Sequence, residues 1–189
     1  MAEFKFPEEK NLVFIGEAGS GKTETAVNLA LRMAREGGRR VHFFDMDQTK
    51  PLFRARDCEA QLEREGVVFH FQAQYLDAPT VASGVIETLR DEGSAVIMDI
   101  GGGSHGSHMI GQFSHLLNSA NTLVLYIVNP FRPWSGSRED IEVTMRRVLG
   151  AARLGSFRLV ANPNLGPETR AEDVLEGLRR FQGLFPGEE

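Results

Sequence analysis

The chain has 189 residues, of which 41% are hydrophobic and 25% are charged, and this length and composition indicate one globular domain over 1–189 and exclude a disordered chain. The formal net charge of −5 argues against nucleic acid and anionic membranes as general partners, and the single cysteine, Cys58, excludes an intrachain disulfide. The N-terminal residues lack the apolar core of a secretory signal and no apolar run is long enough to span a bilayer, so we expect a cytoplasmic protein.

Short apolar runs alternate with longer amphipathic segments along the chain. Residues 11–15 (NLVFI) are continuously apolar apart from the first, which is typical of a strand buried on both faces. Residues 22–35 instead place Ala26, Ala30 and Met33 at helical spacing. The alternation predicts an α/β fold, a three-layer sandwich with a mostly parallel central sheet. In chain order, we expect a strand over 11–15, a helix over 22–35, a strand over 41–44, a helix over 58–64, a strand over 67–71, a helix over 80–90, a strand over 95–100, a helix over 109–117, a strand over 122–128, a helix over 138–149, a strand over 157–161 and a helix over 172–181.

A phosphate-binding motif lies between the first predicted strand and the first predicted helix. Residues 16–23 (GEAGSGKT) match G-x-x-x-x-G-K-[ST] at every fixed position. Glycines let the backbone curl so that its N–H groups face a phosphate chain, and the helix that follows adds its positive end. In such a loop Lys22 contacts the β- and γ-phosphates and the Thr23 hydroxyl ligates Mg²⁺. The motif predicts a P-loop NTPase fold and nucleotide binding by Gly16, Gly19, Ser20, Gly21, Lys22, Thr23 and Glu24.

Three aspartates follow predicted strands. Asp45 and Asp47 come after the second strand, and Asp99 ends the apolar run before three consecutive glycines. Ligands bind at the carboxyl ends of the strands in an open parallel sheet, so all three carboxylates are expected on the ligand side. Asp99 fits a carboxylate that helps to hold Mg²⁺. The residue after it is Ile100 rather than a water-activating Glu, which makes Asp47 the better candidate for orienting water, with capping of helices or turns as the alternative role.

These motifs, in this order, carry a family resemblance. GEAGSGKTETAVNLAL, VHFFDMDQTKP, VIMDIGGG, LYIVNP and LVANP resemble the MinD/ParA/Mrp-type P-loop NTPases of the SIMIBI class, which also holds nickel-insertion ATPases of the CooC type. The resemblance covers about 12–181 and implies ATP, Mg²⁺, a nucleotide-dependent dimer and a partner protein. It also implies that Asp47 positions the attacking water, that Asp45 and Asp99 lie near the metal, and that Asn162 reads adenine.

The loop departs from this family at two positions. The signature lysine directly after the first glycine is Glu17, and a customary glycine is Ala18. A carboxylate facing a dimer partner's phosphates would be repelled, so we expect Glu17 to point to solvent or to a nearby arginine and any homodimer to be weak. No N-K-x-D guanine signature is found at 162–165 (NPNL), which predicts a preference for ATP over GTP.

Other chemistry-bearing residues have plainer interpretations. His105, His108 and His115 follow the Asp99 segment and could ligate zinc or nickel, although a polar loop leading into a helix is sufficient to explain them. Arg132 and Trp134 follow the fifth predicted strand, where they could contact a base or a partner, or pack at a loop.

The sequence therefore predicts an Mg²⁺-dependent ATP-binding protein with slow ATPase activity. We expect it to act as a nucleotide switch on an unidentified partner protein, in metalloenzyme maturation or protein assembly, through the segments 45–56 and 99–108. Two alternatives remain open: a small-molecule kinase, and a non-hydrolysing nucleotide-binding adaptor.

Overall fold

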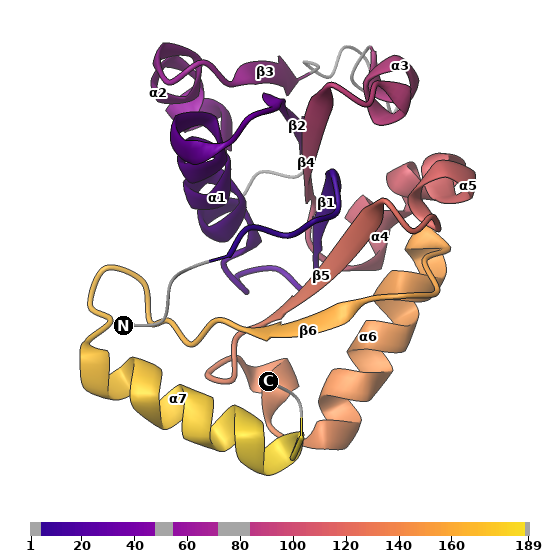
Figure 1. Cartoon of the computed structure of the whole chain (residues 1–189). Helices are drawn as coiled ribbons and strands as arrows, with labels where there is room; N and C mark the ends of the chain where they lie inside the picture. Colours follow the sequence, from indigo (N-terminus) through magenta and orange to yellow (C-terminus); the bar gives the residue numbers. More distant parts are fainter. Residues whose placement is uncertain (1–4, 48–54, 72–83, 188–189) are drawn as a thin grey trace, which may run out of the picture.

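A single parallel sheet organises the chain. The computed structural model describes residues 5–47, 55–71 and 84–187. Six strands pair in the order β3-β2-β4-β1-β5-β6, and every pairing is parallel (Figure 1). This confirms the predicted α/β class. The strands are β1 Asn11–Ile15, β2 Arg40–Met46, β3 Val68–Phe71, β4 Ser94–Ile100, β5 Thr122–Val128 and β6 Arg158–Ala161.

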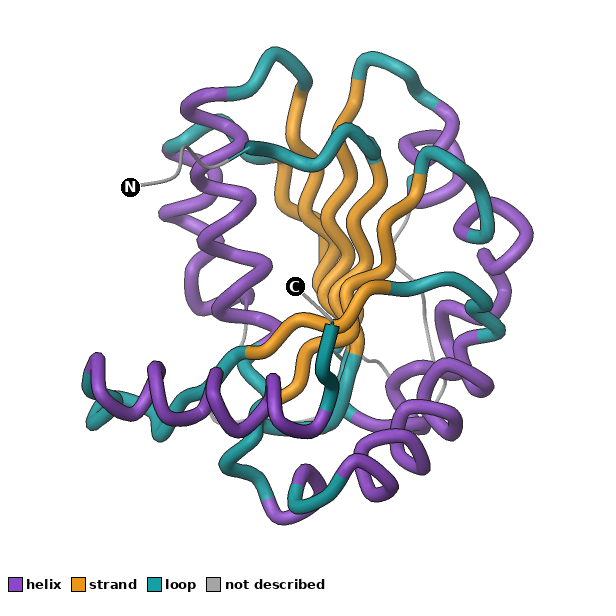
Figure 2. The backbone as a smooth tube through the Cα atoms, turned by 60° about the horizontal axis from the view of Figure 1, so that its bottom comes forward, coloured by secondary structure: helices purple, strands orange, loops and turns teal. Residues whose placement is uncertain are grey.

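Helices cover both faces of the sheet, which forms the middle of the molecule (Figure 2). The α-helices are α1 Lys22–Glu36, α2 Glu59–Arg64, α3 Val85–Arg90, α4 Gly103–His108, α5 Ser114–Leu117, α6 Arg138–Ala152 and α7 Ala171–Leu184. Three short 3₁₀ helices are η1 Ala55–Cys58, η2 Met109–Phe113 and η3 Pro133–Ser135.

Strand β1 lies between β4 and β5 and is buried along its whole length. Its Leu12 and Phe14 pack in one hydrophobic cluster with α1 and α2, while Val13 and Ile15 pack in a second cluster with residues of α3, α5, α6 and α7. Burial on both faces explains why this run is apolar rather than alternating. The loop that follows β1 consequently lies in the middle of the carboxyl edge of the sheet.

Helix α7 closes the second cluster. Its Phe181 is 5% exposed, as is Phe185 just after its end, and the two rings lie 5.3 Å apart. The last predicted helix therefore packs in the core through these two aromatic side chains. Within the described ranges, no helix is both long and apolar enough to cross a bilayer.

One segment is more helical than its sequence suggests. The polar run before residue 109, expected as a loop, forms α4, which continues into η2 and α5. The buried Ser107 hydroxyl donates to the Gly103 carbonyl at 2.7 Å, and a Cβ at Gly106 would collide with the Gly101 carbonyl. Small buried residues let α4 lie close to the end of β4, and they carry no apolar periodicity. Residues 80–83 of the helix predicted over 80–90 lie outside the described residues.

Candidate functional site

The loop between β1 and α1 has a backbone that requires glycine. Gly16, Gly19 and Gly21 have φ values of +148°, +71° and +87°, which side-chain-bearing residues rarely adopt. A Cβ at Gly16 would also lie 2.6 Å from the Ile127 carbonyl oxygen, and one at Gly21 would collide with the Asn162 amide. Helix α1 starts directly after this loop, so its N-terminus faces the same space.

Lys22 is folded into the loop rather than exposed. Its side chain is buried, 6% exposed, and its ammonium donates to the Glu17 carbonyl at 2.9 Å. Burial lowers the pKa of Lys22, while Asp99, Asp47 and Glu17 oppose that shift. The carboxyl groups of Asp99, Asp47 and Glu17 thus surround the Lys22 amine and favour its charged form.

Asp99 is the most unusual group of the site. It lies at the end of β4, beside Phe14 of β1 and Asp45 of β2, on the face covered by α1. It is fully buried, and neither carboxylate oxygen has a hydrogen-bond partner within the described residues. Burial raises its pKa to about 7; the Thr23 hydroxyl and the Lys22 ammonium oppose this rise. A buried carboxylate without a partner fits a cation site of oxygen ligands.

The other two predicted carboxylates lie beside Asp99. Asp45 is 5% exposed, accepts from the Asp47 amide at 3.0 Å and pairs with Arg56 at 3.0 Å. Burial raises the pKa of Asp45 against the opposing effect of Arg56. Arg56 also donates to the Asp47 carbonyl at 2.8 Å, so it ties both aspartates together. The structure therefore gathers all three aspartates near Lys22.

The glycines after β4 contact the phosphate loop directly. The Gly103 amide donates to the Gly16 carbonyl at 3.2 Å. A Cβ at Gly102 would lie 2.8 Å from the backbone of Ala18, so only glycine allows this approach. The segment that carries Asp99 and the loop that carries Lys22 are thus in backbone contact.

The family follows from a sequence comparison. Residues 12–159 match the CobQ/CobB/MinD/ParA nucleotide binding domain. The chain belongs to this family. A comparison with curated proteins gave no match.

Solved structures of the same fold support the architecture of this CobQ/CobB/MinD/ParA domain. The signal recognition particle receptor FtsY from Elizabethkingia anophelis is 21% identical, with a TM-score of 0.56, over 93% of this chain and 56% of that one. Its complex with GDP is 20% identical, with a TM-score of 0.54, over 83% and 50%. The cell division protein ftsY from Thermotoga maritima is 19% identical, with a TM-score of 0.55, over 94% and 60%. The chain thus spans 50–60% of the length of these structures, and the similarity is one of fold.

Two side chains from distant strand-end loops hold the outer side of the phosphate loop of this domain. The Asn162 amide, after β6, donates to the Ser20 carbonyl at 2.9 Å. Arg132, after β5, donates through Nε to the Gly19 carbonyl at 3.0 Å. The adenine contact of Asn162 stays a prediction, and its amide group already has this structural partner. Sequence reasoning missed the Arg132 contact, since no local spacing connects residues so far apart.

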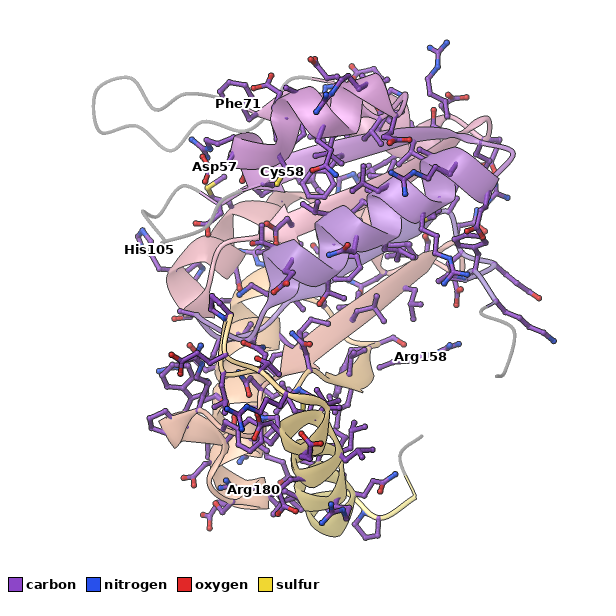
Figure 3. The ribbon with its side chains drawn as sticks, turned by 90° about the vertical axis from the view of Figure 1, so that its left-hand side faces the viewer. Asp57, Cys58, Phe71, His105, Arg158 and Arg180 are labelled. Atoms are coloured by element: carbon purple, nitrogen blue, oxygen red, sulfur yellow. The ribbon has the colours of Figure 1, made fainter. Side chains whose placement is uncertain are left out.

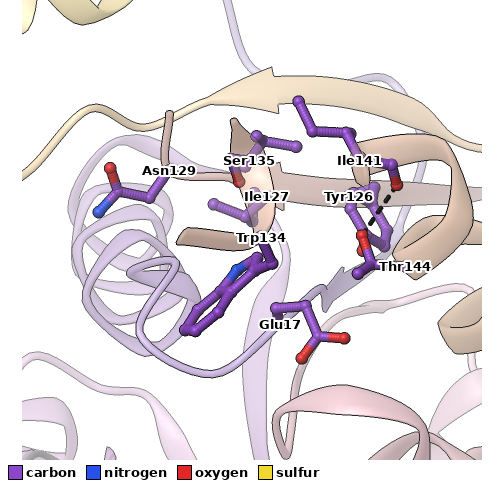
Figure 4. Close-up of a pocket in the computed structure, with 9 residues that line it drawn as sticks. Glu17, Tyr126, Ile127, Asn129, Trp134, Ser135, Ile141 and Thr144 are labelled. Atoms are coloured by element: carbon purple, nitrogen blue, oxygen red, sulfur yellow. Dashed lines mark hydrogen bonds between the residues drawn. The ribbon is translucent and has the colours of Figure 1, made fainter. Parts of the chain in front are cut away.

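Glu17 points to an arginine, which confirms that expectation. Its carboxylate pairs with the Arg147 guanidinium of α6 at 2.5 Å. Beside this pair is a cavity of about 10 Å³, lined by Tyr126, Trp134 and Thr144 among others (Figure 4). That volume corresponds to about one water molecule, so it is no second substrate pocket.

The three histidines are exposed at the surface. His105 and His108 belong to α4 and His115 to α5, and all three are exposed. Figure 3 shows His105 at the surface. Within the described ranges, no group of three or more His, Cys, Asp or Glu side chains is arranged to hold a metal ion. Metal binding by these histidines stays a prediction without support from the described geometry.

Proposed function

We propose that this domain, as a single unit over 1–189, binds Mg·ATP at residues 16–23 and hydrolyses it slowly. The observation that carries the proposal is the fully buried carboxylate of Asp99, which lies next to Lys22 and Thr23 and has no hydrogen-bond partner among the residues that the structure describes. Such a group is costly to bury unless a ligand compensates it. A divalent cation bound with a polyphosphate supplies that compensation.

The roles of the residues follow from their positions. Lys22 binds the phosphates, and the loop amides and the N-terminus of α1 add further donors. The Thr23 hydroxyl, Asp45 and Asp99 present oxygen atoms suited to Mg²⁺. Bound Mg²⁺ would neutralise charge on the phosphates. Asp47, 8% exposed and beside Gly101, accepts a hydrogen bond from the attacking water and orients it.

A switch on a partner protein follows from the contacts of the site. Gly102 and Gly103 touch the phosphate loop, so a change in the loop displaces the segment 99–108. Arg56 links Asp45 and Asp47 by hydrogen bonds, so a change at either aspartate reaches the other. Residues 48–54 of the predicted switch segment 45–56 lie outside the described residues. We infer a partner protein in metalloenzyme maturation or protein assembly, and at most a weak homodimer, because Glu17 is paired with Arg147.

The nucleotide is tested by titrating the purified chain with Mg·ATP and Mg·GTP in a calorimeter and by measuring phosphate release. ATP is expected to bind at least about tenfold more tightly, because no aspartate follows β6 to accept from guanine. GTP is the relevant competitor, since one structure of the same fold holds GDP. Equal or tighter binding of GTP would contradict the ATP assignment. ATP binding without phosphate release would favour the adaptor, and release only with a small-molecule acceptor would favour the kinase.

Replacing Asp47 with asparagine tests the hydrolytic step. D47N should retain Mg·ATP binding within about threefold and lose about 100-fold in phosphate release, because a neutral amide polarises water poorly. Single-turnover phosphate release at saturating Mg·ATP is the measurement. Asp173, which caps α7 far along the chain from the phosphate loop, provides a matched control, and D173N should release phosphate at the wild-type rate. Wild-type hydrolysis by D47N would remove Asp47 from the mechanism.

A further inference from the structure

We propose that Arg132 is a positioning residue that holds the phosphate loop in its binding conformation. This inference rests on the proposed nucleotide site. The Arg132 Nε donates to the Gly19 carbonyl at 3.0 Å. The guanidinium packs closely on this residue, because a Cβ added at Gly19 would lie 3.2 Å from the Arg132 Cζ. Arg132 thus touches the loop at a glycine with positive φ.

The contact determines where the next amide points. The peptide bonds are trans, so the carbonyl of Gly19 and the N–H of Ser20 point in opposite directions. Because Arg132 holds that carbonyl outward, the Ser20 amide points inward, where it donates to the Glu17 carbonyl at 3.3 Å. The Lys22 ammonium donates to the same oxygen at 2.9 Å. Two donors that a phosphate needs thus converge on one carbonyl of the loop, and the Arg132 contact orients the first of them.

Asn162 acts on the neighbouring peptide in the same way. It holds the Ser20 carbonyl outward at 2.9 Å, which turns the Gly21 amide inward. Gly19 and Gly21 both have positive φ, and glycine peptides rotate more easily than others. A loop built from such residues needs external hydrogen bonds to keep its carbonyls away from phosphate oxygens, and these two side chains supply them.

Arg132 is itself held firmly. Its amide donates to the Asn129 carbonyl at 3.1 Å, and its carbonyl accepts from Ser135 at 3.0 Å. Asn129 is fully buried, and its side chain donates to the Asn164 carbonyl at 2.8 Å and accepts from the Phe131 amide at 3.1 Å. The loops after β5 and β6 therefore form one hydrogen-bonded unit, from which Arg132 and Asn162 both reach the phosphate loop.

The competing role for Arg132 is direct contact with the γ-phosphate. Within the described ranges its two terminal nitrogens make no hydrogen bond, so they have donors to offer a phosphate. A positioning residue affects every ligand that uses the loop amides, whereas a γ-phosphate contact affects ATP alone. Mg·pyrophosphate, Mg·ADP and Mg·ATP therefore distinguish the two roles.

The experiment is calorimetric titration of wild type, R132A, R132M and R132K with these three ligands. R132A and R132M should bind all three about tenfold more weakly, because each loses one charge-assisted hydrogen bond to the loop. R132K, which keeps a donor, should recover to within about threefold of wild type. R179A removes an equally charged but exposed arginine of α7 and should bind as wild type does. The Ser20 amide signal in a nitrogen-15 correlation spectrum of the free protein should shift in R132M and stay in place in R179A.

Three results would overturn the inference: wild-type affinity in R132M, a loss confined to Mg·ATP, or no recovery in R132K. R132M keeps the length of the apolar stem, so it carries the test if R132A does not fold. A wild-type chain that binds none of the three ligands would instead refute the proposed nucleotide site, so the two failures are distinguishable.

Discussion

Replacing Lys22 with alanine is expected to weaken Mg·ATP binding at least about 100-fold, or about 3 kcal/mol, since it removes the charged donor nearest the phosphates. Lys22 is 6% exposed, and its ammonium already donates to the Glu17 carbonyl of the loop. Removing it also leaves the buried carboxylate of Asp99 without its nearest opposing charge. Calorimetric titration with Mg·ATP measures the loss.

A second buried lysine makes a matched control. Lys10 is 4% exposed and pairs with the Asp91 carbonyl at 2.9 Å and with Glu92 at 3.1 Å, just before β1 at the opposite edge of the sheet. K10A should lose stability and keep the wild-type affinity. Unchanged affinity in K22A would contradict the assignment of residues 16–23 as a phosphate loop.

Replacing Asp99 with asparagine is expected to stabilise the free protein above pH 7 and to remove the Mg²⁺ dependence of nucleotide binding. The pKa of Asp99 is raised from 3.8 to about 7, mainly by burial. The native state therefore keeps a proton that the unfolded state releases near pH 4. Its stabilising effect is complete below about pH 4 and is lost as the pH rises through 7. Asparagine carries no charge to bury, so D99N should exceed wild type by about 1–3 kcal/mol at pH 8.

Denaturant unfolding of wild type and D99N at about pH 3.5 and pH 8 measures this effect. At about pH 3.5 the wild-type carboxyl is mostly protonated in both the folded and the unfolded state, and the two proteins should be equally stable within about 0.5 kcal/mol. Taking the difference between them cancels the contributions of other groups, such as the half-buried His42 and His70, whose pKa values desolvation lowers. A difference that is the same at both pH values would contradict a raised pKa. Mg²⁺-dependent nucleotide binding retained by D99N would remove Asp99 from the metal site.

Much of the fold was predictable because its signals are local. The strands predicted over 11–15 and 122–128 coincide with β1 and β5, since a run buried on both faces must be apolar throughout. The phosphate loop was predictable because its glycines occupy positive-φ positions that other residues avoid. Helix α4 was missed because close backbone packing of Gly106 and Ser107 leaves no apolar pattern.

The amino-acid sequence by itself determined the parallel α/β class, the position of the phosphate loop and the set of strand-end aspartates around it. It also indicated that Glu17 would turn to an arginine, but only the tertiary structure selected Arg147, which lies 130 residues away. Arg132 and Asn162 reach the loop across 113 and 142 residues in the same manner. Strand order decides such contacts, because β5 and β6 follow β1 on one side of the sheet and bring their loops to the same edge. The complete burial of Asp99, whose two oxygens have no hydrogen-bond partner among the described residues, likewise depends on strands and helices that no local spacing connects.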